Sequence, residues 1–117
     1  MNILSLAYLG DSVYEVYIRS YLASLGLKVK QMQEKSIDYV SAKAQCKYLD
    51  KMIDDNFLTD EEISIVKRGR NHKSHSNKST DIVTYKKSTG LESLIGYLKI
   101  NGNDDRIEEI MKYIVGD

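Results

Sequence analysis

The sequence predicts an all-α protein, and three observations support this. The 117 residues contain no proline, the residue that most strongly interrupts a helix. Long stretches place apolar residues at positions i, i+3 and i+4, the spacing of one helix face. Strand and turn signals are sparse. We expect a single helical bundle, because a chain of this length suits one compact domain, spanning residues 1–117.

The first half of the chain predicts two long helices. The first runs from about Leu4 to Leu25 and ends at Gly26, a residue that commonly terminates helices. It is apolar on nearly every side, as expected of a central, buried helix. The second runs from about Gln31 to Ile53 and turns residues such as Ile37 inward.

The second half predicts three shorter helices. Thr59 and Glu62 form a capping box that opens a helix from Asp60 to Lys67. Another opens at Ser88 or Thr89 and ends before the Asn-Gly pair at 101–102. Asn103 caps the last one, where acids in the first turn complement the helix dipole.

Composition excludes several classes of protein. Basic and acidic residues balance at 17 each, so the net charge does not attract nucleic acid. A local basic patch that binds nucleic acid is still compatible with this balance. A single cysteine, Cys46, excludes a disulfide framework and a multi-cysteine zinc site. No apolar run reaches the roughly 18 residues of a membrane span, and the N-terminus has no basic signal-peptide region. We therefore expect a soluble, cytoplasmic protein.

The first helix carries three charged residues spaced by four. Asp11, Glu15 and Arg19 fall on one face. A Glu15–Arg19 ion pair on a solvated face explains two of them. Asp11 is explained less well, because a second acid one turn from Glu15 adds repulsion and favours a cation. Asp11 is therefore a candidate ligand for a hard cation.

A second acid, Glu92, lies between Gly90 and Gly96. Taken alone, Thr89 and Glu92 suggest a second capping box. The glycines weaken a purely structural interpretation, since each costs up to about 1 kcal/mol relative to alanine in a helix. They indicate a close approach of something to the backbone.

The segment from Lys67 to Lys87 holds seven basic residues and one acid. It is rich in polar residues and predicts a long loop, and such loops are usually functional or disordered. Arg68, Arg70, Asn71 and Lys73 offer groups that bind phosphate. The alternative is a solvated, disordered run of charge.

Three ordered motifs resemble the ribonuclease III family. The stretch from Leu6 to Glu15 contains Leu-Gly-Asp and resembles the family's signature helix. Glu92-Ser-Leu-Ile-Gly96 resembles its second acidic motif. The Arg-Gly-Arg-Asn-x-Lys-Ser stretch at 68–74 narrows the resemblance to the Mini-III branch, which lacks a double-stranded-RNA-binding domain.

The resemblance implies that Asp11 and Glu92 are the catalytic residues and hold Mg²⁺, with Glu15 and Thr89 as candidates to orient ligands or water. The motifs of classical ribonuclease III enzymes contain further acidic residues, but only these two are present here. Leu4, Ala7 and Thr89 occupy the positions of the other acids. The number of metal ions therefore stays open.

The resemblance also implies the substrate and partners. We expect an endoribonuclease that leaves 5′-phosphate and 3′-hydroxyl ends in double-stranded RNA, read by shape and phosphates. The expected biological substrate is the 23S ribosomal RNA precursor, cut at both ends by a homodimer whose interface includes the tyrosine-rich first helix. A ribosomal protein that presents the RNA is a further candidate partner. A catalytically inactive RNA-binding or ribosome-assembly module and a purely structural helical domain remain alternatives.

Overall fold

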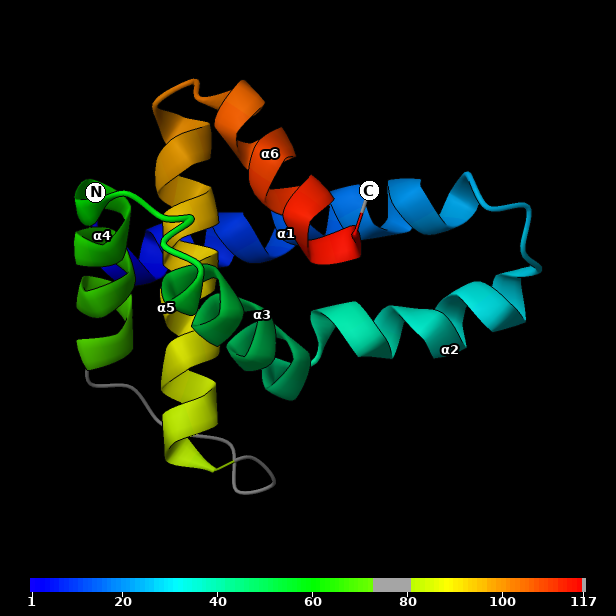
Figure 1. Cartoon of the computed structure of the whole chain (residues 1–117), viewed down its shortest axis with the longest axis horizontal. Coiled ribbons are helices and arrows are strands. Elements are labelled where there is room, and N and C mark those ends of the chain that lie inside the picture. The colour runs from blue at the N-terminus through cyan, green and yellow to red at the C-terminus, as the bar shows by residue number, and fades with distance from the viewer. Residues whose placement is uncertain (73–80, 117) are drawn as a thin grey trace.

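The protein is all-α, as predicted. The computed structural model describes residues 1–72 and 81–116. Within these ranges the chain forms six helices and no strand (Figure 1). The helices are α1 (Ile3–Ala23), α2 (Val29–Val40), α3 (Ala42–Asp54), α4 (Asp60–Asn71), α5 (Ile82–Ile100) and α6 (Asp104–Val115). No helix of the described ranges is long and apolar enough to cross a membrane.

Helix α5 is the centre of the bundle. It crosses α1 and packs against α3 and α4 on its other sides (Figure 1). Leu91, Leu94 and Ile95 are completely buried along it. The expectation that the first helix is buried on nearly every side is wrong, because Tyr8 is 86% and Val16 63% exposed. One side of α1 is therefore an open apolar face.

Two glycines allow α1 and α5 to cross in backbone contact. A Cβ atom on Gly10 would lie 1.8 Å from the Glu92 carbonyl oxygen, and one on Gly96 would lie 1.9 Å from the Leu6 carbonyl oxygen. Both distances are far inside van der Waals contact. Gly90 faces the Val66 backbone of α4 in the same way, at 2.7 Å. The close approach inferred from Gly90 and Gly96 is confirmed, and what approaches is another helix.

The helix predicted from Gln31 to Ile53 is in fact two helices. Ser41 is extended, with φ −65° and ψ 153°, and its hydroxyl oxygen accepts from the Ala44 amide at 3.1 Å. Ser41 thereby caps α3 and breaks the continuous helix. Ile37 lies on α2, which carries no buried residue, and is 61% exposed rather than turned inward.

The charged segment after residue 67 is more helical than predicted. Helix α4 continues to Asn71, and α5 begins at Ile82, where the Asp81 carboxylate accepts from the Thr84 amide at 3.0 Å. The start predicted at Ser88 or Thr89 is therefore wrong. So is the second capping box, because Thr89 and Glu92 lie in the interior of α5.

The capping box at the start of α4 is confirmed and is part of a larger contact. The Glu62 carboxylate accepts from the Thr59 backbone amide at 2.9 Å and also from Arg106 of α6, with both guanidinium bonds at 2.8 Å. Burial by itself raises the pKa of Glu62, but the bonds from Arg106 and Thr59 outweigh it and hold the pKa below its usual value. This ion pair joins α6 to α4. Helix α6 begins after Asn103 as predicted, but without a side-chain cap.

Candidate active site

Asp11 and Glu92 meet where α1 crosses α5. Asp11 follows Gly10, and Gly10 is the residue that contacts the Glu92 backbone. The two carboxyl groups lie within hydrogen-bonding range of each other, although 80 positions of sequence separate them. Asp11 is exposed and Glu92 is partly buried. The crossing therefore presents a pair of acids at the edge of the core.

The environment of Glu92 strongly disfavours a negative charge. Burial, followed by the adjacent Asp11, raises the pKa of Glu92 from 4.5 to about 8. A carboxyl group that is partly desolvated beside another acid gains most from a nearby cation or from a retained proton. The pair consequently has the electrostatic character of a cation site.

The donor set suits a hard divalent cation. Carboxylate oxygens are preferred ligands of Mg²⁺, which keeps several of its waters and needs few protein ligands. No group of three or more His, Cys, Asp or Glu side chains gathers anywhere in the described residues. The chain would thus supply Asp11 and Glu92, and water or substrate oxygens would complete the coordination.

Two further candidates, Glu15 and Thr89, have other partners. Glu15 accepts from Arg19 at 3.2 Å on the exposed side of α1, so the simple ion-pair interpretation is confirmed. Thr89 is buried, and its hydroxyl donates to the Tyr85 carbonyl at 3.1 Å. These two hydrogen bonds do not join Glu15 or Thr89 to Asp11 or Glu92.

The sequence analysis missed Gln45. This residue of α3 is only 2% exposed, and its side-chain amide is near enough to Glu92 to oppose, as the smallest of the contributions, the rise in the pKa of that carboxyl group. A signal was present in the sequence. Gln45 stands in line with Leu49 and Met52 on the buried face of α3, and a polar residue on an apolar face requires a partner.

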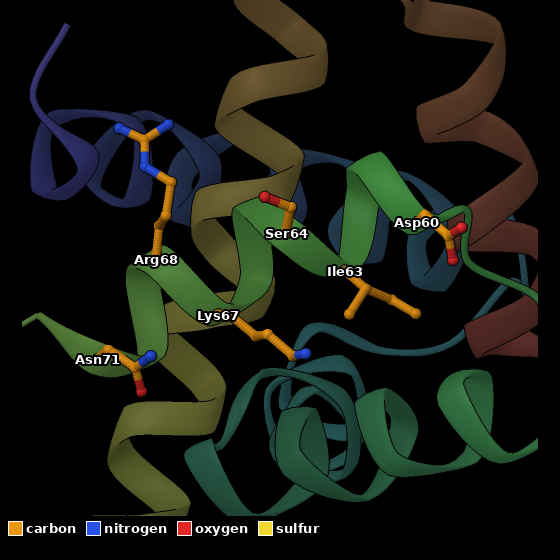
Figure 2. A pocket seen from close by; sticks show the side chains of 6 residues that line it. All are labelled: Asp60, Ile63, Ser64, Lys67, Arg68 and Asn71. Carbon is orange, nitrogen blue, oxygen red and sulfur yellow. The ribbon is translucent and has the colours of Figure 1, made fainter.

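The basic residues divide between two sides of α4. A hollow of about 600 Å³ lies beside the helix. Figure 2 shows the side chains that line it, which are those of Asp60, Ile63, Ser64, Lys67, Arg68 and Asn71. In that view the Arg68 side chain extends away from Lys67 and Asn71, toward the start of α1. The exposed face of α4 thus offers an ammonium, a guanidinium and an amide at its C-terminal end. These groups lie on a helix, not in the predicted loop.

Arg70 does not share this face. It is half-buried, its Nε donates to the Asn71 side-chain oxygen at 3.3 Å, and it lies near Lys87 of α5. Lys87 in turn pairs with Asp50 of α3 at 2.9 Å. Lys73, the fourth predicted RNA contact, lies outside the described residues.

Comparison with known proteins assigns the family. The family model described as "Ribonuclease III domain" matches residues 4–103. "Mini-ribonuclease 3" of Enterococcus faecalis is 45% identical over 98% of this chain and 89% of its own length. The protein of the same name from Staphylococcus aureus is 41% identical over 98% of this chain and 87% of its own. The chain belongs to the Mini-III branch of the ribonuclease III family.

A solved structure has the same fold as this Mini-III chain. A crystal structure of a Fusobacterium nucleatum protein superposes with a TM-score of 0.87 at 30% identity, covering 98% of this chain and 92% of that one. The family match ends at residue 103, immediately before α6. Both acids and the face of α4 therefore lie inside the part shared with the family.

Membership of the ribonuclease III family makes this protein an endoribonuclease. Enzymes of the family act on double-stranded RNA and generally depend on a divalent metal ion. The resemblance found in the motifs around Asp11 and Glu92 is thereby confirmed.

Proposed function

We propose that this Mini-III ribonuclease hydrolyses double-stranded RNA at Asp11 and Glu92 with Mg²⁺, leaving 5′-phosphate and 3′-hydroxyl ends. The observation that carries the proposal is the convergence of these two acids from α1 and α5, with the pKa of Glu92 raised to about 8. Phosphodiester hydrolysis needs an activated water and stabilisation of charge at phosphorus. Bound Mg²⁺ supplies both.

The side chains divide the remaining work. Asp11 and Glu92 are the proposed metal ligands and so fix where the scissile phosphate is bound relative to α1 and α5. Thr89 and Glu15 are proposed to assist indirectly, Thr89 by stabilising the turn of α5 before Glu92 and Glu15 by its negative charge one turn after Asp11. Both roles are compatible with the bonds that these residues make inside their own helices.

RNA is proposed to contact the exposed end of α4. Arg68 and Asn71 reach solvent there, next to Lys67. Guanidinium and ammonium groups bind phosphates without reading bases, which suits duplex RNA. Arg70 and Lys73 remain proposed contacts, Arg70 from the side of α4 that faces Lys87.

The proposed biological assembly is a homodimer, with residues 1–117 as one catalytic domain in each subunit. The apolar face of α1 supports this, because Tyr8 and Val16 are largely exposed. The proposed substrate is the precursor of 23S ribosomal RNA in the cytoplasm, cut at both ends, and a ribosomal protein that presents this RNA is a proposed partner. These assignments follow from the resemblance to Mini-III enzymes.

The decisive experiment is cleavage of an end-labelled RNA duplex with and without Mg²⁺. Asp11→Asn and Glu92→Gln should each lose cleavage while still binding the duplex. Glu108→Gln is the matched control, since Glu108 is an exposed acid of α6, outside the part of the chain that the family model matches. Binding without cleavage by the unmodified protein would support the inactive RNA-binding module instead. Loss of cleavage in Glu108→Gln equal to that in Asp11→Asn would refute the assignment of the two acids.

Two further measurements test the finer parts of the proposal. Sedimentation of Tyr8→Glu should show monomers if the apolar face of α1 forms the dimer interface. A precursor of 23S ribosomal RNA should be cut at the mature ends faster than a duplex of unrelated sequence, with or without ribosomal proteins. Equal rates on both RNAs under both conditions would refute the proposed substrate.

A further inference from the structure

One short stretch of α5 is in very close contact with two other helices. On one side, a Cβ atom on Gly10 of α1 would lie 1.8 Å from the Glu92 carbonyl oxygen. On another side, a Cβ atom on Gly69 of α4 would lie 2.4 Å from the Oγ and 2.8 Å from the Cβ of Ser93. Gly69 and Ser93 are both buried. Residues 92 and 93 therefore join α1 and α4 through α5.

The residues in contact are the sequence neighbours of the proposed functional groups. Gly69 directly follows Arg68, a proposed phosphate contact, and Ser93 directly follows Glu92, a proposed metal ligand. Arg68 is exposed, and its side chain extends toward the start of α1, the helix that carries Asp11 (Figure 2). The Gly69–Ser93 contact thus links the group that would bind the RNA backbone to the acids that would bind the metal ion.

This contact leaves α4 little freedom to move relative to α5. The Ser93 Cβ is attached to the backbone, and the Ser93 hydroxyl donates to the Thr89 carbonyl at 2.8 Å. A second close approach lies one turn earlier on each helix, where a Cβ atom on Gly90 would lie 2.7 Å from the Val66 carbonyl oxygen. In such a tightly packed interior, an added methyl group must shift a whole helix.

A polar contact fixes the other end of α4 to the same helix. The Tyr97 hydroxyl of α5 donates to the Glu61 carboxylate of α4 at 2.6 Å. Glu61 lies near the start of α4 and Gly69 near its end. Helix α4 is therefore held against α5 along its length, and the position of Arg68 relative to Glu92 is fixed by the fold.

We propose that Gly69 is a positioning residue: its contact with Ser93 sets the distance between the RNA phosphate bound by Arg68 and the phosphate that is hydrolysed. This inference rests on the proposed function, because it concerns the same phosphate contact and the same acids. Gly69 is buried and so does not itself touch the RNA. Misplacing a bound group by about 1 Å can lower a reaction rate by about 100-fold.

The test adds a methyl group to the contact. In Gly69→Ala, the new Cβ would have to move from 2.8 Å to about 3.5 Å from the Ser93 Cβ, which shifts α4 by about 0.7 Å. At saturating RNA duplex and Mg²⁺, the single-turnover rate constant for cleavage should fall at least about 10-fold. The KM for the duplex should change less than about 3-fold, because Arg68 stays exposed. An unchanged rate constant would overturn the proposal.

Compensating variants separate positioning from loss of stability, at a temperature where all of them are folded. Gly69→Ala combined with Ser93→Gly moves the missing Cβ from one helix to the other, and its rate constant should return to within about 3-fold of the unmodified protein. Gly69→Ala combined with Ser93→Ala keeps the obstructing Cβ and should stay slow. Ile65→Ala is the matched control, because Ile65 is buried on the same helix but its shortening adds no volume. Failure of Ser93→Gly to restore the rate, or an equal loss in Ile65→Ala, would overturn the proposal.

A second measurement needs no change inside the fold. Duplexes with one phosphate replaced by an uncharged methylphosphonate identify the phosphate that Arg68 binds, because this replacement weakens binding by the unmodified protein but not by Arg68→Ala. That phosphate should lie at one fixed number of nucleotides from the cut in duplexes of different sequence. A distance that varied among duplexes would overturn the role of Gly69. An unmodified protein that does not cut the duplex, or duplex binding unaffected by Arg68→Ala, would instead refute the proposed function, so the two failures are distinguishable.

Discussion

Replacing Gly10 by alanine should separate α1 from α5 at the site. The new Cβ would lie 1.8 Å from the carbonyl oxygen of Glu92 and 2.8 Å from the Gly96 amide nitrogen. Contact normally begins near 3.5 Å, so the helices would have to part by about 1.5 Å. Both obstacles are backbone atoms, and no rotamer change can move them aside.

The magnitude follows from two opposing effects. Overpacking a well-packed core costs up to about 3 kcal/mol, and a clash with backbone belongs at the upper end of that range. Alanine recovers about 1 kcal/mol of helix propensity relative to glycine. The net loss is about 2 kcal/mol in the free energy of unfolding. For a chain of this size, that loss lowers Tm by about 8 °C.

Calorimetry and urea unfolding of Gly10→Ala measure this loss, with Ser20→Ala as control. Ser20 lies on the exposed side of the same helix, so its replacement should change stability by less than about 0.5 kcal/mol. Because the clash moves Glu92 away from Asp11, Gly10→Ala should also weaken stabilisation by Mg²⁺. If Gly10→Ala melted at or above the temperature of the unmodified protein, the close crossing of α1 and α5 would be refuted.

Three other predictions concern charge. In EDTA, the melting temperature of Glu92→Gln should exceed that of the unmodified protein at pH 8.5 and approach it toward pH 5. The reason is that a Glu92 pKa raised to about 8 makes the native state lose stability as the pH rises from about 4.5 through 8. A constant difference in melting temperature across this pH range would contradict the prediction. Arg106→Leu should lower the free energy of unfolding in urea by about 3 kcal/mol, because it leaves Glu62, whose side chain is 8% exposed, without its ion-pair partner. Adding Glu62→Gln should recover part of this loss. Fully additive effects of the two substitutions would argue against a coupled pair. Arg68→Glu should weaken duplex binding, reduce the slope of the logarithm of the binding constant against log[salt] by about one, and leave Tm unchanged. Replacing an exposed basic residue of α6, in Lys112→Glu, should leave duplex binding unchanged.

Local patterns predicted most of the helices correctly. The capping box at Thr59 and Glu62 and the acids at the start of α6 were identified from spacing alone. The errors fell where a helix boundary depended on a single side chain. Ser41 ends a run of good helix formers, and Asp81 begins α5 before a β-branched run that is unfavourable in helices.

The candidate site was predicted only in part. Asp11 and Glu92 were identified from their motifs, the Leu-Gly-Asp at 9–11 and the Glu-Ser-Leu-Ile-Gly at 92–96. Gln45 was not, because nothing within α3 indicates which carboxylate it would face. The setting of Arg70 was also predicted wrongly, since Gly69 continues the helix and Arg70 lies on the side of α4 that faces Lys87, not in a loop with Arg68.

The amino-acid order alone determined the helical class, the two motif acids and the glycines beside them, because helix formation and motif spacing depend on residues a few positions apart. Only the tertiary structure decided that α1, α3 and α5 bring Asp11, Gln45 and Glu92 together. It also decided which basic residues of α4 reach solvent. The physical reason is that contacts between distant segments depend on how helices cross, and here the crossing depends on missing Cβ atoms at Gly10 and Gly96.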